Sequence, residues 1–149
     1  MKGVLYMKAL TLRPEFAELV SNGIKTIECR TWKTDYRGDI LITSSSKIRS
    51  GTIPGHALCV AELYDIRPMK REDADAACMK KVDCTSDKYA WCLRNIRVIE
   101  PFPVKGKLSL WNFEEEEKIK ILMTVLELYS LPNEEYNALC DRYWEALYV

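Results

Sequence analysis

Residues 23–32 read Gly23-Ile24-Lys25-Thr26-Ile27-Glu28-Cys29-Arg30-Thr31-Trp32, and the sequence Tyr36-Arg37-Gly38 follows shortly afterwards. The glycine ends a short helical pattern, and the alternation after it predicts a strand over residues 24–31. Side chains alternate between the two faces of a strand. One face would carry Ile24, Thr26, Glu28 and Arg30, and the other Lys25, Ile27, Cys29 and Thr31. This pattern suits a barrel strand with a charged face turned into a cleft, or alternatively an edge strand whose charges face water.

A second block makes this sequence resemble a known family. The first block continues as Asp39-Ile40-Leu41-Ile42, and the second reads Tyr89-Ala90-Trp91-Cys92-Leu93 and then Pro103-Val104-Lys105-Gly106-Lys107-Leu108-Ser109-Leu110-Trp111-Asn112. In this order and at about this separation, the two blocks closely resemble the ASCH domain (activating-signal-cointegrator homology), a family of the PUA-like group of β-barrels. The resemblance covers roughly residues 7–113.

The resemblance implies an α+β fold in which residues 1–113 form a PUA-like mixed β-barrel with flanking helices. Strand-like patterns lie at residues 5–12, 24–31, 39–45, 55–69, 89–102 and 108–111. Pro14 suits the first turn of a helix over residues 14–22, immediately before the motif strand. Residues 70–81 are expected to form a short helix or loop.

Residues 114–149 are expected to form a C-terminal helical extension. Four consecutive glutamates from residue 114 favour the first turn of a helix that runs to about residue 129, and Pro132 breaks the pattern. One face of the following helix carries Tyr136, Leu139, Cys140, Tyr143, Trp144 and Leu147. We therefore expect a helical hairpin that packs on the barrel or on a partner, which allows a homo-oligomer through these helices.

The charges are unevenly distributed along the chain. The 149 residues contain 22 Lys or Arg and 22 Asp or Glu. Residues 1–113 hold 19 of the basic and 13 of the acidic residues, a net +6, and residues 114–149 hold 3 and 9, a net −6. The basic part is compatible with a polyanionic partner. The acidic part either dampens non-specific attraction to nucleic acid or forms solvated helix faces.

Composition excludes several other classes of protein. No apolar run approaches the ~20 residues of a spanning helix, and no signal-peptide pattern is present, so we expect a cytoplasmic protein without a membrane partner. The six cysteines form no Cys-x-x-Cys pair, and His56 is the one histidine. Paired ligand spacing is therefore missing, and we expect no metal site and no cofactor.

The resemblance implies an RNA-binding or modified-nucleoside-binding module, because PUA-type barrels recognise RNA in a cleft lined by the motif residues. Some relatives are instead hydrolases, either amidohydrolases acting on an acylated cytidine nucleoside or ribonucleases. In the amidohydrolases the motif strand carries a lysine, matched by Lys25, and a threonine nucleophile, whose position holds Glu28. Many relatives also carry a histidine where this chain has Thr43. The alternative function is therefore a small hydrolase with Lys25 and Glu28 as the catalytic pair, without that hydroxyl nucleophile or that histidine.

The candidate RNA- or nucleotide-binding residues are Lys25, Glu28, Arg30, Trp32, Tyr36, Arg37, Ser45, Lys47 and Lys105. The lysine–glutamate pair would read a base or sugar edge, the arginines would contact phosphate, and the aromatic rings would stack on a base. The loop that begins Ser44-Ser45-Ser46-Lys47 and the cationic turn at residues 105–107 offer further phosphate donors.

Lys25 and Glu28 lie on opposite faces of an ideal strand, so they would meet only at a bulge or at a strand end. A purely structural alternative pairs Glu28 with Arg30. A broad basic face that joins Arg37, Lys47, Arg49, Lys105 and Lys107 would favour a polymer ligand. A closed pocket around the lysine–glutamate pair would favour a small substrate.

Overall fold

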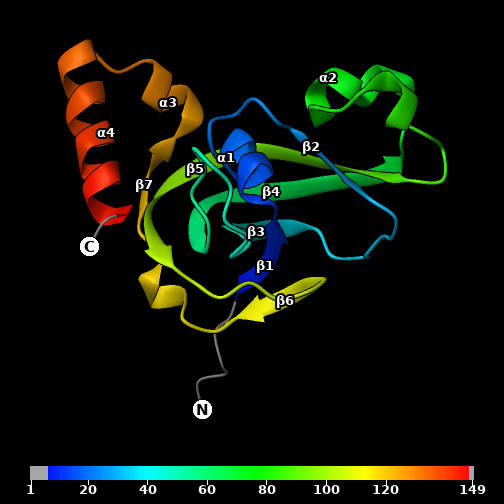
Figure 1. Ribbon diagram of the computed structural model, residues 1–149, viewed down its shortest axis with the longest axis horizontal. Helices are drawn as coiled ribbons and strands as arrows, with labels where there is room; N and C mark the ends of the chain where they lie inside the picture. The colour runs from blue at the N-terminus through cyan, green and yellow to red at the C-terminus, as the bar shows by residue number, and fades with distance from the viewer. Residues whose placement is uncertain (1–6, 148–149) are drawn as a thin grey trace.

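The computed structural model of the protein describes residues 7–147, with side chains described as far as residue 145. Within these residues a mixed sheet of seven strands forms the centre of the fold (Figure 1). The strands are β1 (Met7–Leu12), β2 (Ile27–Arg30), β3 (Gly38–Ser44), β4 (His56–Pro68), β5 (Tyr89–Pro103), β6 (Leu110–Phe113) and β7 (Ile121–Thr124). Residues 5–6 of the expected first strand lie outside the described residues.

The strand order is β2-β5-β4-β3-β1-β6, and β7 also pairs with β5. Strands β1 and β3 run parallel, and the other pairs run antiparallel. A parallel pair needs a crossover connection. Here the helix α1 (Pro14–Ser21) and strand β2 supply that connection. The mixed α+β character expected from the sequence is confirmed.

The sheet does not close into a barrel, which corrects the expected closed barrel. The path ends at β2 on one side and at β6 on the other, and these two strands do not pair. Two short strands share one edge of the long strand β5, where β2 pairs with residues 89–92 and β7 with residues 97–99.

Helix α1 covers the sheet next to the motif strand. Pro14 occupies its first turn as expected, and Pro14, Ala17 and Val20 are buried. Gly23 follows the helix with φ +81°, and a Cβ there would lie 2.8 Å from Cγ1 of Val125. Glycine is therefore required both by the left-handed backbone and by the close packing.

The segment between β4 and β5, residues 69–88, folds as a compact excursion that we call the wall segment (Figure 1). It contains the short helices η1 (Arg71–Asp73), α2 (Ala74–Ala77) and η2 (Lys81–Asp83). Arg67 fixes its base through two hydrogen bonds of 2.7 Å to the carboxylate of Asp73. The guanidinium and a backbone amide hold the pKa of this carboxyl below its ordinary value, because both favour the charged form.

The prediction of a first helix in the C-terminal hairpin is largely wrong. Residues 114–129 instead form η3 (Glu116–Lys118), strand β7 and a short helix α3 (Val125–Tyr129). The apolar residues of β7 complete the open edge of β5, which outweighs the helical pattern. Thr124 then begins α3 through a capping box. Its hydroxyl accepts a hydrogen bond from the backbone amide of Glu127, and its own backbone amide donates one to the side-chain carboxylate of Glu127.

The second C-terminal helix, α4 (Asn133–Leu147), is present as expected and packs beside β5 (Figure 1). Tyr143 packs against the main apolar core, and burial raises the pKa of its phenol. Trp144 remains 49% exposed, and the side chain of Leu147 lies outside the described residues. No helix among residues 7–147 is long and apolar enough to cross a membrane.

The packing of α4 predicts that Tyr143→Ala destabilises the protein. We expect the free energy of unfolding to fall by about 2 kcal/mol, less than the ~3–5 kcal/mol of a fully buried aromatic truncation, because Tyr143 is only partly buried. Denaturant unfolding of the full chain measures this change. Asn137→Ala is the matched control, since Asn137 is exposed on the same helix and should change stability by less than about 0.5 kcal/mol. Equal effects of the two substitutions would show that α4 does not stabilise the domain.

Candidate functional site

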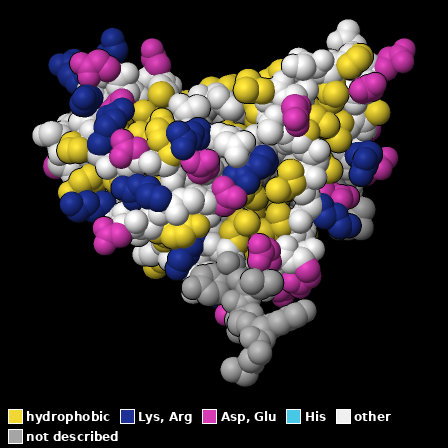
Figure 2. Space-filling view, turned by 180° about the vertical axis from the view of Figure 1, so that it is seen from behind, with side chains coloured by type: hydrophobic (Ala, Val, Ile, Leu, Met, Phe, Trp, Pro, Cys, Tyr) yellow, Lys and Arg dark blue, Asp and Glu magenta, His cyan; other side chains and the backbone are white. Residues whose placement is uncertain are grey.

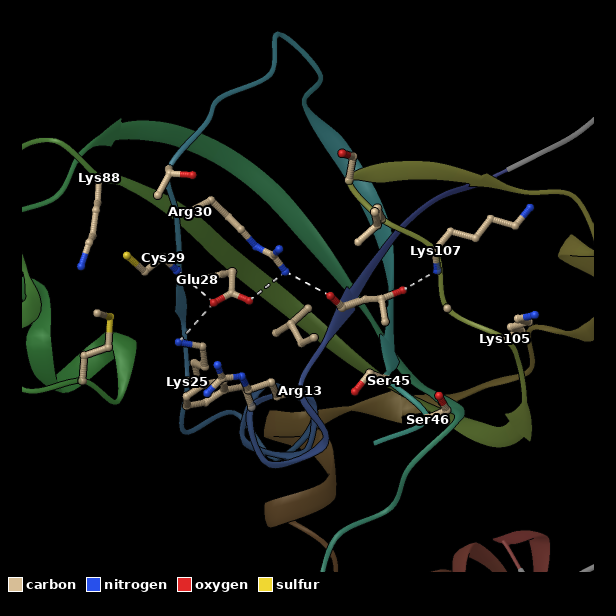
Figure 3. A pocket seen from close by; sticks show the side chains of 18 residues that line it. Arg13, Lys25, Glu28, Cys29, Arg30, Ser45, Ser46, Lys88, Lys105 and Lys107 are labelled. Carbon is tan, nitrogen blue, oxygen red and sulfur yellow. Dashed lines mark hydrogen bonds and ion pairs between the residues drawn. The ribbon is translucent and has the colours of Figure 1, made fainter. Parts of the chain in front are cut away.

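A pocket of about 730 Å³, lined by several charged side chains, lies beside the motif strand (Figure 3). Its lining comes from the end of β1 and the start of α1, from β2, from the loop after β3, from the wall segment and from the loop before β6. We call this last loop, residues 104–109, the rim loop. Segments that are far apart in the sequence therefore meet around the charged residues of β2.

Lys25 forms a buried corner of the pocket and is only 1% exposed. Its Nζ donates a 2.5 Å hydrogen bond to the carbonyl of Ala77, the last residue of α2. The ammonium also lies 3.6 Å from Oε1 of Glu28 and 5.0 Å from the centroid of the Phe16 ring. Cys78, next along the chain, has a left-handed backbone at φ +55° that ends α2 where Lys25 meets its carbonyl. Lys25 therefore ties the wall segment to the motif strand.

Lys25 and Glu28 meet because β2 is shorter than expected. The strand begins at Ile27, so Lys25 precedes it and the alternation of faces does not extend to this residue. The backbone amide of Lys25 donates instead to the carbonyl of Leu19 in α1, and the amide of Thr26 donates to the carbonyl of Ala76. These contacts turn the lysine toward the carboxylate. A strand end, rather than a bulge, brings the two charges together.

Glu28 is 6% exposed and provides the carboxylate of the pocket. Its Oε1 accepts a 3.0 Å hydrogen bond from the backbone amide of Cys29, and its Oε2 lies 3.4 Å from Nη2 of Arg30. Lys25 and Arg30 thus flank the carboxylate on opposite oxygens. The expected Glu28–Arg30 pair is present, and it coexists with the lysine contact.

Arg30 links the carboxylate to β1. Its Nη2 also donates to the backbone carbonyl of Thr11 at 3.1 Å, while its Nε is buried without a hydrogen-bond partner. A buried N–H without a partner costs free energy. The side chain as a whole is 24% exposed and lines the pocket, so part of the guanidinium remains accessible there.

Thr11 positions the rim loop. Its Oγ1 accepts hydrogen bonds from the amide of Lys107 at 3.2 Å and from Nε1 of Trp111 at 3.1 Å, and it lies 2.9 Å from Oγ1 of Thr43. A Cβ at Gly106 would lie 2.4 Å from the methyl group of Thr11, so glycine allows this close approach. Thr43 is buried behind this contact and does not line the pocket.

The pocket carries a strong excess of positive charge. Six cationic side chains among the described residues line it, namely Arg13, Lys25, Arg30, Lys88, Lys105 and Lys107, and Glu28 is their acidic counterpart in the lining. In the described part of the chain, Arg13, Lys88, Lys105 and Lys107 form no ion pair with a carboxylate. Uncompensated cations around one cavity favour an anionic ligand.

Cys29 also lines the pocket but is not an activated nucleophile. Burial raises the pKa of its thiol, although Lys88 opposes the effect. The thiol therefore remains protonated near neutral pH and is a weak nucleophile. No group of three or more His, Cys, Asp or Glu residues within residues 7–147 could hold a metal ion.

Five of the residues proposed from the sequence meet in this pocket, and the other four do not. The five are Lys25, Glu28, Arg30, Ser45 and Lys105. Trp32 packs edge-on against Trp91, with ring centroids 4.7 Å apart, and the hydroxyl of Tyr36 donates to the carbonyl of Asp39. Arg37 donates to the carbonyls of Thr34 and Tyr36, and Lys47 is exposed on the loop after β3.

Several further lining residues were missed by the sequence analysis, among them Thr11, Arg13 and Lys88. Thr11 and Arg13 flank the start of α1, where Pro14 already indicated the helix terminus, so their position next to the motif strand could have been considered. Lys88 ends the wall segment. No local sequence signal marks it, because its approach to the pocket depends on how residues 69–88 fold back.

Comparisons with known proteins agree with this fold. The family model of the ASCH domain matches residues 10–131. The crystal structure of ASCH from Zymomonas mobilis is similar at a TM-score of 0.59 and 20% identity, covering 84% of this chain and 94% of that chain. A tyrosine-to-phenylalanine mutant of that protein is similar at a TM-score of 0.58 and 20% identity, covering 84% of this chain and 97% of that chain. A serine-to-alanine mutant is similar at a TM-score of 0.58 and 19% identity, covering 83% of this chain and 94% of that chain. No curated protein matches the chain significantly in sequence.

The buried arrangement of Lys25 and Glu28 predicts energetic coupling between them. Each single substitution, Lys25→Met or Glu28→Gln, leaves the other charge buried with fewer partners, so the double variant should lose less stability than the sum. We expect a coupling free energy of about 0.5–3 kcal/mol from denaturant unfolding of the four proteins.

The exposed pair Arg94–Glu62, with an N–O distance of 2.8 Å, is the matched control. The cycle Arg94→Met and Glu62→Gln should give about 0.2–1 kcal/mol, because water screens this pair. A Lys25–Glu28 coupling no larger than the control value would contradict the proposed role of burial.

Proposed function

Because the chain belongs to the ASCH domain family, we propose that it binds RNA by taking a nucleotide unit into the pocket beside β2. The observation that carries this proposal is the charge of the lining, in which six cationic side chains surround the single carboxylate of Glu28. Phosphate groups would supply the missing negative charge, and the pocket size falls within the range of small-molecule sites.

The location of the charges favours a pocket over a broad basic face. Figure 2 shows Lys and Arg side chains interspersed with Asp and Glu on the face seen from behind. Of the basic residues considered for a broad face, Arg49 lies 3.7 Å from Glu15 and Arg37 contacts backbone carbonyls of its own turn. Lys105 and Lys107 instead line the pocket with Lys25. The protein would therefore bind one nucleotide unit of the RNA in the pocket rather than a long stretch of RNA along a wide surface.

The buried charges would read the neutral part of the nucleotide. Glu28 offers carboxylate lone pairs to N–H or O–H donors of a base or sugar, and Lys25 and Arg30 offer donors on either side of it. Charge-assisted hydrogen bonds of this kind are stronger than neutral ones. Trp32 and Tyr36 do not line the pocket, and Phe16, which does, already has the ammonium of Lys25 over its ring.

A second function, hydrolysis, is favoured by the same Lys25–Glu28 pair. The 3.6 Å separation would let the carboxylate accept a proton from water while the ammonium stabilises the developing oxyanion. The substrates implied by the family resemblance are an acylated cytidine nucleoside and RNA. Neither a histidine base nor an activated thiol lines the pocket among the described residues, so this pair would carry the chemistry.

The binding proposal predicts that two variants of the protein differ in how they bind a short single-stranded RNA. Fluorescence anisotropy between about 50 and 200 mM salt should show that Lys105→Gln combined with Lys107→Gln weakens binding and flattens its salt dependence, by about 0.7 in the log–log slope for each phosphate that is no longer neutralised. Glu28→Gln should weaken binding without changing the slope, because Glu28 contacts no phosphate. Lys80→Gln, an exposed change outside the pocket lining, should alter neither quantity.

Chromatography of the same RNA and of an acylated cytidine after incubation distinguishes the two functions. Binding without turnover supports the RNA-binding module, whereas turnover abolished by both Lys25→Ala and Glu28→Gln supports the hydrolase. If the unmodified protein neither binds nor converts either compound at about 50 mM salt, both proposals fail.

A further inference from the structure

The cations of the pocket lie on two sides of its carboxylate. Figure 3 shows Lys88 on one side and Lys105 and Lys107 on the other, with Glu28 and Arg30 between them. The two sides come from different segments, because Lys88 ends the wall segment and the other two lysines belong to the rim loop. A single phosphate would leave one of these sides unused.

From this arrangement we propose that the pocket recognises a nucleotide with a phosphate on each side of its sugar, and that Lys88 binds one phosphate while Lys105 and Lys107 bind the other. The ligand class is therefore a nucleoside 3′,5′-bisphosphate or the internal unit of a single strand, rather than a nucleoside or a monophosphate. This inference rests on the proposed nucleotide-binding function and specifies its ligand.

Lys88 is held in place but retains donors for an anion. Its backbone carbonyl accepts from the amide of Met69, which fixes it at the start of β5. Its Nζ donates one hydrogen bond of 3.0 Å to the carbonyl of Asp83. An ammonium group has three donors, so two remain for phosphate oxygens.

The two lysines of the rim loop are placed differently from Lys88, and Figure 3 shows the side chain of Lys107 extending away from Glu28. The amide of Lys107 is fixed by Thr11, and the Nζ of Lys107 lies 5.4 Å from the centroid of the Trp111 ring. The amide of Val104 donates to the carbonyl of Gly55 and anchors the start of the loop. Neither lysine has a carboxylate partner within residues 7–147, so their charge is available to a ligand.

The carboxylate between the two sides explains why the phosphates would be separated. The oxygens of Glu28 only accept hydrogen bonds, and those of an ionised phosphate do the same, so the two groups cannot bond directly to each other even though Lys25 and Arg30 balance the charge of Glu28. A neutral group that donates hydrogen bonds is favoured there, as a base edge or a sugar hydroxyl would be. A nucleotide with a phosphate on each side of its sugar has this distribution of charge, with two anionic groups around a neutral part that donates hydrogen bonds.

Isothermal titration of the full-length protein with a set of uridine and guanosine compounds tests this inference. For each base the set contains the nucleoside, the 3′-phosphate, the 5′-phosphate, the 3′,5′-bisphosphate and a trinucleotide. The bisphosphate should bind about tenfold more tightly than either monophosphate, because it gains one further set of charge-assisted hydrogen bonds. A trinucleotide tighter than the bisphosphate would identify a strand as the source of the ligand, and the reverse order would identify a free nucleotide.

Substitutions assign each phosphate to one side of the pocket. Lys88→Gln should weaken the bisphosphate and one of the monophosphates about tenfold, and Lys105→Gln with Lys107→Gln should weaken the bisphosphate and the other monophosphate. Lys80→Gln in the wall segment and Lys120→Gln before β7 are exposed controls outside the pocket lining and should leave all affinities unchanged.

Two results would overturn the inference. One is a bisphosphate that binds no more tightly than the better monophosphate, including one that does not bind at all. The other is that both sets of substitutions weaken the same monophosphate, since the two sides would then hold one phosphate. If single-stranded RNA still binds in either case, the proposed function stands and this ligand assignment alone fails.

Discussion

The buried ammonium of Lys25 is the interaction that joins the fold to the candidate site. Its hydrogen bond to the carbonyl of Ala77 fixes the wall segment against the start of β2, and its position beside Glu28 sets the carboxylate in the pocket. Burying a charge is costly unless partners compensate it. Lys25 finds this compensation from a carbonyl, a carboxylate and the face of the Phe16 ring. Three segments therefore converge on one ammonium group at this corner of the pocket.

The other cations of the pocket are placed close together in a way that does not stabilise the fold. Glu28 is compensated by Lys25 and Arg30, so the four cations beyond this group, Arg13, Lys88, Lys105 and Lys107, add repulsion without a carboxylate partner in the described residues. Mutual repulsion among these cations lowers stability slightly, and an anionic ligand would remove that cost. Elsewhere the protein neutralises its arginines locally, as in the Arg67–Asp73 and Arg97–Asp39 pairs. The contrast supports ligand binding at the pocket.

Much of this arrangement could be predicted from local sequence, and the rest depends on tertiary contacts. The strand-like patterns at residues 39–45 and 55–69, the proline at the start of α1 and the glycine after it correctly indicated the elements around the motif. The strand β7 was missed because its pairing with β5 outweighs a helical pattern, although the Thr124–Glu127 capping box was present in the sequence as a helix start. The inclusion of Lys88 depends on how the wall segment folds, which no residue spacing reveals.

The location of the bound nucleotide tests this account most directly. Titration of isotope-labelled protein with a short single-stranded RNA, followed by backbone amide chemical shifts in NMR spectra, reports which residues the ligand approaches. The account predicts that the largest changes lie in β2, in the loop after β3, at Lys88 and in the rim loop. Changes concentrated on α3 and α4, with those segments unaffected, would contradict it.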